Sequence, residues 1–316
     1  MYRWLRVCVC LKPSVSARRL SEFEIIFGGN MRLDPLQKSN DIEDRRGSSG
    51  GIMGGGAGRI GIGGMILAAV AYFVFGINPS TTLSTVSAVN SMTGGGSSSA
   101  TGTKGLRTED EQGVFVSKVF QSTKDVWTQA FGGKYRAPTM VLYSGRTQTA
   151  CGVGQAAAGP FYCPGDQKVY LDLSFFNELQ KMGAGGDFAQ AYVIAHEVGH
   201  HIQYLTGVEQ KVSNMRSRLS EAQNNALSVR MELQADCYAG VWAARANASN
   251  QILEQGDIEE GLNAAHKIGD DYLQKQAQGY AVPDSFTHGS SAQRMQWFKQ
   301  GLQSGDPNAC NTFAQN

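Results

Sequence analysis

The chain has 316 residues, which is enough for one domain of ordinary size with additional segments. Its formal net charge is +1, and its basic residues form no stripe interleaved with aromatic residues, which argues against nucleic acid as a partner. Glycine is densest before residue 110 and around residues 183–186, so a glycine-rich N-terminal third precedes an ordinary globular sequence.

Residues 1–30 carry no pattern of a folded element, whereas charged residues become frequent after Met31. We interpret residues 1–30 as an upstream translation before a natural start at Met31, or alternatively as a disordered tail. We expect residues 31–59 to form a glycine-rich segment in the cytoplasm that ends in a flexible Gly/Ser linker.

Residues 60–77 form an uncharged apolar run, and as a helix they would span about 27 Å, just enough for a bilayer. Basic residues precede this run (Arg45, Arg46 and Arg59), and none follows until Lys104. The positive-inside rule therefore predicts a single-pass transmembrane helix in the inner (cytoplasmic) membrane, with the C-terminal domain on the periplasmic side. The alternatives are a buried core helix and a signal peptide cleaved near Val86-Ser87-Ala88. Residues 78–103 are expected to be a flexible linker, and residues 104–316 the catalytic domain.

Four cysteines follow residue 104, and an even number in an exported domain suggests disulfides. Cys151 and Cys163 flank a short Gly/Ala-rich loop and form the easiest pair to close, which leaves Cys237 to pair with Cys310. Free thiols and a thiolate zinc site are the alternatives, although the sequence has no CxxC spacing.

Residues 187–205 have the character of a helix, with Asp187 as a suitable N-cap and Gly207 as a stop. The segment contains His196-Glu197-Val198-Gly199-His200, and its two histidines at i and i+4 project from one helix face. This spacing lets both imidazoles reach one tetrahedral ion, and Glu197 beside them can take a proton from a water molecule. The alternative is a core helix with hydrogen-bonded histidines. We expect His201 to point away from the ion, either as a structural residue or as a residue that supports the ligands from behind.

A catalytic zinc ion needs a third protein ligand, and the helix expected over residues 227–246 supplies a candidate. Glu232 and Asp236 lie one turn apart in apolar surroundings, where carboxylates are normally paired or bound to metal. We predict Glu232 as the third ligand and Asp236 as the acceptor for a ligand histidine's N–H. The alternative is a pair of surface carboxylates.

His288 lies on a Gly/Ser-rich turn, where it could donate a hydrogen bond to the oxyanion of a tetrahedral intermediate. An exposed residue without function is the alternative. Arg294 begins a helical run to Leu302 and is a candidate partner of Asp236 or of the substrate.

Six stretches between Met31 and the C-terminus carry a combined pattern: Glu43-Asp44-Arg45-Arg46, Gly159-Pro160-Phe161-Tyr162-Cys163-Pro164, Val169-Tyr170-Leu171-Asp172-Leu173, His196-Glu197-Val198-Gly199-His200-His201-Ile202-Gln203, Glu232-Leu233-Gln234-Ala235-Asp236-Cys237 and Phe286-Thr287-His288-Gly289. Together they resemble the bacterial neutral zinc metallopeptidases, from Met31 almost to the end of the chain. The resemblance implies peptide-bond hydrolysis and a zincin-like α+β domain, mainly helical with a small sheet, for which residues 137–143 and 168–175 are candidate strands. It also supports Met31 as the start.

The sequence therefore predicts a membrane-bound endopeptidase that uses Zn²⁺, acts on a peptide or protein substrate and has Glu197 as its general base. Two other functions stay open: an inactive zincin-like binding or scaffold module, and an amidase acting on cell-wall peptides.

Overall fold

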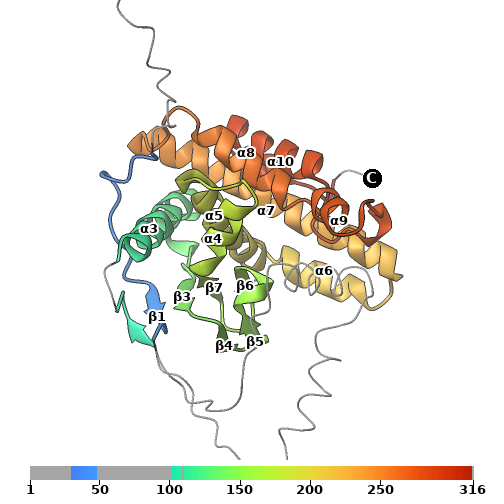
Figure 1. The fold of residues 1–316 in the computed structure, drawn as a ribbon, viewed down its shortest axis with the longest axis horizontal. Coiled ribbons are helices and arrows are strands. Elements are labelled where there is room, and N and C mark those ends of the chain that lie inside the picture. Colours follow the sequence, from blue (N-terminus) through green and yellow to red (C-terminus); the bar gives the residue numbers. More distant parts are fainter. Residues whose placement is uncertain (1–29, 48–101, 108–109, 315–316) are drawn as a thin grey trace, which may run out of the picture.

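The computed structural model describes residues 30–47, 102–107 and 110–314, which form a mainly helical body on a small sheet (Figure 1). This architecture is the α+β class that the sequence predicts. The expected transmembrane segment, residues 60–77, lies outside the described residues. Within the described ranges, no helix combines the length and the apolar character that a membrane span needs.

The sheet has five strands in the order β2-β1-β3-β7-β6. Its centre is parallel, because β1 and β7 both run parallel to β3, and its two edge strands are antiparallel to their neighbours. A separate hairpin of β4 and β5 extends from the sheet. The strands are β1 (Ile42–Asp44), β2 (Thr103–Lys104), β3 (Thr139–Tyr143), β4 (Arg146–Thr149), β5 (Gly152–Gln155), β6 (Phe161–Cys163) and β7 (Lys168–Asp172).

The second predicted strand is shorter than its apolar pattern suggests. β7 stops at Asp172, and residues 174–175 already belong to a helix. The Asp172 carboxylate explains this end, because it accepts hydrogen bonds from the backbone N–H groups of Gly145 and Ser174. These contacts turn the chain out of the sheet.

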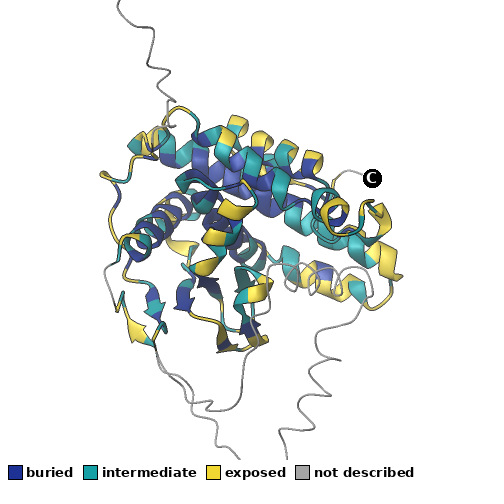
Figure 2. Ribbon diagram, in the orientation of Figure 1, coloured by how far each residue is buried: buried dark blue, intermediate teal, exposed yellow. Residues whose placement is uncertain are grey.

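Helices α5 and α7 are the central elements of the helical body, and both are buried along the stretch where they meet (Figure 2). α7 begins with a capping box between Ser220 and Gln223. The N-cap of α5 is Gly186 rather than the predicted Asp187, whose carboxylate lies in the first turn. The helices are α3 (Glu111–Phe131), α4 (Ser174–Lys181), α5 (Asp187–Leu205), α6 (Val208–Arg216), α7 (Glu221–Asn250), α8 (Asp257–Lys267), α9 (Asp270–Gln278) and α10 (Ser291–Ser304).

Residues 31–47 belong to this same body, which corrects their assignment to a segment separate from the domain. Met31, Leu36 and Ile42 are buried in the main core, and β1 pairs with β3 inside the sheet. This strand could not be predicted from the sequence, because three residues leave almost no periodicity to detect.

Two of the basic residues that precede the apolar run, Arg45 and Arg46, form ion pairs in the fold. Arg45 pairs with Glu43 at 2.7 Å, and Arg46 pairs with the buried Asp44 at 2.8 Å. Arg46 also binds Asp110 at 2.8 Å and so links β1 to the start of α3.

Both predicted disulfides are present. Cys151–Cys163 fastens the β4–β5 hairpin to the edge strand β6. Cys237–Cys310 joins the middle of α7 to the C-terminal segment across a sequence separation of 73 residues.

We predict that the longer disulfide stabilises the protein more than the shorter one. Chain entropy alone gives about 4 kcal/mol for the Cys237–Cys310 loop and about 3 kcal/mol for the Cys151–Cys163 loop. Urea unfolding of the pairwise variants C237S/C310S and C151S/C163S measures both losses without leaving one cysteine of a pair unpaired. An equal or smaller loss for C237S/C310S would contradict the prediction.

Candidate metal centre

The site lies where α5 crosses α7, and a glycine allows the two helices to approach closely. A Cβ atom at Gly199 would lie 3.0 Å from the backbone oxygen of Ala235. Such a contact is tighter than nearly all real Cβ contacts, so a larger residue would push the helices apart. The glycine within His196-Glu197-Val198-Gly199-His200 therefore brings the α7 side chains within reach of the histidines.

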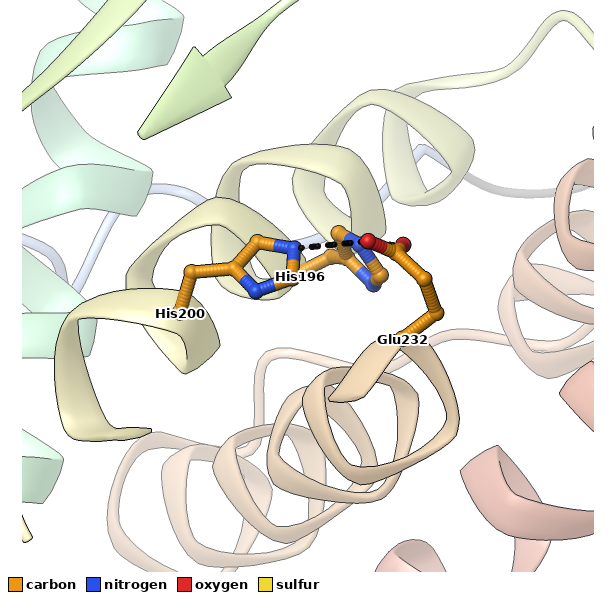
Figure 3. A group of neighbouring side chains, drawn as sticks. All are labelled: His196, His200 and Glu232. Atoms are coloured by element: carbon orange, nitrogen blue, oxygen red, sulfur yellow. Dashed lines mark hydrogen bonds and ion pairs between the residues drawn. The ribbon is translucent and has the colours of Figure 1, made fainter. Parts of the chain in front are cut away.

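His196 and His200 project from α5 toward Glu232 on α7 (Figure 3). The Nε2 atom of His196 lies 3.1 Å from one Glu232 oxygen, and that of His200 lies 3.5 Å from the other. One donor atom from each residue lies within 4.8 Å of the others. Two ligands bound 2.1 Å from a tetrahedral zinc ion are about 3.4 Å apart, so this set fits zinc.

Asp236 is fully buried one turn after Glu232 and holds His196 in place. His196 Nδ1 lies 2.9 Å from Asp236 Oδ1, so Nδ1–H donates to this carboxylate, while Nε2 faces Glu232 and is the atom that a metal would bind once its proton is lost. Arg294 on α10 donates to both Asp236 oxygens at 2.9 Å, and the Tyr192 hydroxyl donates to Oδ1 at 2.5 Å. The predicted contact of Arg294 is thus with Asp236.

The negative charges around His196 favour a positive group. Burial opposes the imidazolium form, but Asp236 and Glu232 outweigh it and raise the pKa of His196 to about 10. The pKa of Glu232 lies well below its ordinary value although burial opposes its ionisation, because His200, His196 and His288 are close by. A bound cation would be favoured by the same carboxylates.

Glu197 is buried and belongs to the same electrostatic cluster. Burial raises its pKa, and the Glu232 carboxylate acts in the same direction, while His200 and His196 oppose the shift. A raised pKa brings a carboxylate closer to the range in which it can accept and then release a proton near neutral pH.

Two residues of the site were not predicted from sequence. Gln203 orients the second histidine, since its Oε1 atom lies 2.9 Å from His200 Nδ1, and Tyr192 supports Asp236 from one turn before His196. The Gln203 amide also donates to Met231 and Gln234 on α7, so it joins the two helices. Its position three residues after His200, on the same helix face, is the sequence feature from which this role could have been predicted.

His201 points away from this cluster into the sheet side of α5. Its Nδ1 lies 2.9 Å from the Tyr162 hydroxyl on β6, and its Nε2 lies 2.6 Å from the Arg136 carbonyl oxygen. Burial lowers its pKa, which keeps the ring neutral. The side chain has the structural contacts that we expected for it.

His288 is brought to the Glu232 side of the cluster by the turn that follows α9. The backbone N–H groups of Thr287, His288 and Gly289 all donate to one oxygen of the buried Asp270, and His288 Nδ1 lies 3.2 Å from its other oxygen. Asp270 and Glu232 raise the pKa of His288 although burial opposes this. The turn is therefore a fixed structure, and its histidine is close enough to interact electrostatically with Glu232.

Comparison with known proteins identifies the family of the chain. Residues 31–313 match the family described as "Putative neutral zinc metallopeptidase". An uncharacterized Escherichia coli protein, YpfJ, is 50% identical over 293 residues, which cover 90% of this chain and 99% of the relative. An uncharacterized Mycobacterium tuberculosis protein is 44% identical over 209 residues, which cover 61% of this chain and 68% of the relative. No solved structure matches the chain significantly. The chain therefore belongs to this family of zinc metallopeptidases.

Proposed function

We propose that this protein is a zinc-dependent peptidase whose metal is held by His196, His200 and Glu232. The observation that carries the proposal is the meeting of three donor atoms within 4.8 Å beside the buried Glu197. Two imidazoles and one carboxylate are a donor set found in catalytic zinc sites, where a fourth position serves water or substrate.

Zinc at such a site supplies a Lewis acid that polarises the scissile carbonyl and makes water a better nucleophile. Glu197 accepts a proton from the attacking water and passes it to the leaving amine. The raised pKa of Glu197 suits both steps, because the protonated form must persist long enough to act as an acid. Asp236 and Arg294 keep the His196 ring in the required tautomer and orientation.

His288 is proposed to donate a hydrogen bond to the developing oxyanion. Three backbone hydrogen bonds to Asp270 fix its turn, so the donor is already in place before the reaction. The electrostatic contact with Glu232 supports this location.

The substrate is proposed to be a peptide in an extended conformation. In the described part of the chain, β6 is an edge strand of the five-stranded sheet, and it packs against α5. A peptide could add to this edge by main-chain hydrogen bonds. Tyr162 on β6 contacts His201 of α5, so this edge has a fixed position relative to the histidine pair.

The two disulfides support a location outside the cytoplasm, since such bonds persist in oxidising compartments. Residues 31–47 share the body that contains these disulfides, so we place them in the same compartment. Attachment to the inner membrane through residues 60–77 stays a prediction, although a single crossing there would separate β1 from the sheet in which it pairs.

Replacing Glu232 by alanine is expected to weaken zinc binding by more than about 100-fold. Residues that only support the ligands typically cost about 10- to 100-fold in affinity when they are replaced. Competition with a chromophoric chelator measures the affinity. Glu221→Ala is a matched control, because Glu221 is an exposed glutamate on the same helix. Unchanged affinity in Glu232→Ala would remove Glu232 from the ligand set.

Replacing Glu197 by glutamine should retain zinc and lower turnover by about 10²–10⁴-fold or more, because the amide cannot accept a proton from water. The assay compares an unfolded protein with peptidoglycan as substrates, with and without chelator. Cleavage of peptidoglycan alone would favour the cell-wall amidase, whereas near-normal turnover by the variant would rule out Glu197 as the base.

Replacing His288 by alanine should lower kcat by about a hundredfold and leave KM and zinc content nearly unchanged, as expected for a group that acts only in the transition state. His266→Ala, a histidine on α8, serves as the control. Wild-type kcat in His288→Ala would exclude the oxyanion role.

A further inference from the structure

A second group of acidic side chains lies at the N-terminal ends of α5 and α8. Asp187 begins α5, Asp257 begins α8, and Glu260 follows one turn later. One carboxylate oxygen from each of the three lies within 4.8 Å of the others. None of these residues contributes to the metal centre described above.

Asp257 makes this group more than a cluster of surface acids. Its side chain is 1% exposed, and one oxygen, Oδ2, accepts a hydrogen bond from the backbone N–H of Glu254 at 2.8 Å. The other oxygen, Oδ1, is buried and has no hydrogen-bond partner. A buried carboxylate oxygen without a partner is costly, and such groups normally bind a donor or a metal.

The charges of the group are not balanced by basic side chains. Among residues 30–47, 102–107 and 110–314, no Lys, Arg or His forms an ion pair with these three carboxylates. Burial raises the pKa of Asp257 to about 6, and the neighbouring charge of Asp187 adds to the shift. Burial raises the pKa of Asp187, although a hydrogen bond with Glu260 opposes the shift. Burial and the charges of Asp187 and Asp257 raise the pKa of Glu260.

The backbone is shaped around one of these carboxylates. Gly186 has φ 134°, and a Cβ atom there would fall 2.2 Å from a Glu260 oxygen. The same oxygen accepts a hydrogen bond from the Phe188 N–H at 3.1 Å. Glu260 is thus held in place by the first turn of α5, with no room for another side chain.

We propose that Asp187, Asp257 and Glu260 form a calcium-binding site. Carboxylate oxygens are the ligands that hard cations prefer, whereas zinc in proteins favours nitrogen and sulfur as well. Ca²⁺ binds oxygen at about 2.3–2.6 Å, so two ligands on opposite sides of it lie about 4.6–5.2 Å apart. The spacing of the three oxygens admits one such ion, and the unpartnered oxygen of Asp257 gains a ligand bond.

The position of this site gives the ion a structural role. The Met31 backbone N–H donates to Asp187, and the Arg32 N–H donates to the Ile252 carbonyl oxygen at 2.8 Å. The ion would therefore join the N-terminal segment, α5 and α8 at one point. Because α5 also carries His196 and His200, calcium stabilises the helix on which the metal centre depends.

The test measures calcium binding by the full-length chain after its metal centre is loaded with zinc. Isothermal titration with CaCl₂ at pH 7.5 should give one ion per chain, and Tm should rise by about 5–10 °C at a hundredfold excess over Kd. MgCl₂ should give a smaller shift, because Mg²⁺ demands a tighter octahedral geometry.

Asp257→Asn is the decisive variant. Its amide keeps an acceptor for the Glu254 N–H and brings a donor to the other two carboxylates, so the protein should fold without calcium and lose the calcium-dependent rise in Tm. Glu260→Gln should lose it as well. Glu259→Gln, which removes a neighbouring exposed charge from the same helix, should retain it.

The proposal is overturned if the wild-type chain shows no calcium-dependent heat and no rise in Tm. Protons shared between the three carboxyl groups, rather than a cation, would then offset their negative charge. It is equally overturned if Asp257→Asn retains the full rise, because the ion would then bind elsewhere.

Discussion

The buried carboxylate of Asp236 is the group on which the architecture of the site depends. It lies in the core of α7 and is surrounded by donors from two other helices: the Tyr192 hydroxyl and His196 ring of α5, and the Arg294 guanidinium of α10. Breaking such a buried pair by removing one partner typically costs about 3–5 kcal/mol. One charge therefore fixes the relative positions of three helices and the orientation of a candidate ligand.

The arrangement combines close backbone packing with a concentration of negative charge. Gly199 lets α5 approach α7, and this closeness brings Glu232 within 3.1 Å of His196. Asp236 adds a second carboxylate behind the same ring. A divalent cation in front of His196 would offset the repulsion between these charges, so the geometry and the electrostatics favour the same occupant.

The parts of the site that depend on local spacing could be predicted from the sequence. Histidines at i and i+4 share a helix face wherever the helix lies, and two carboxylates on an apolar helix need partners in any fold. The two disulfides could be predicted because four cysteines allow only a few pairings. The contacts of Gln203 with α7 and the three backbone hydrogen bonds to Asp270 could not be predicted, because they depend on how distant segments pack.

The pairing of β1 within the sheet constrains the path of the chain relative to a membrane. The chain leaves the sheet after β1 and returns in β2, which lies beside it with Asp44 opposite Thr103. Both ends of the intervening stretch are therefore on the same side of any bilayer. A chain segment that begins and ends on the same side of a membrane crosses it an even number of times or not at all. A single crossing by residues 60–77 would put β1 and β3 in different compartments, where they could not share hydrogen bonds.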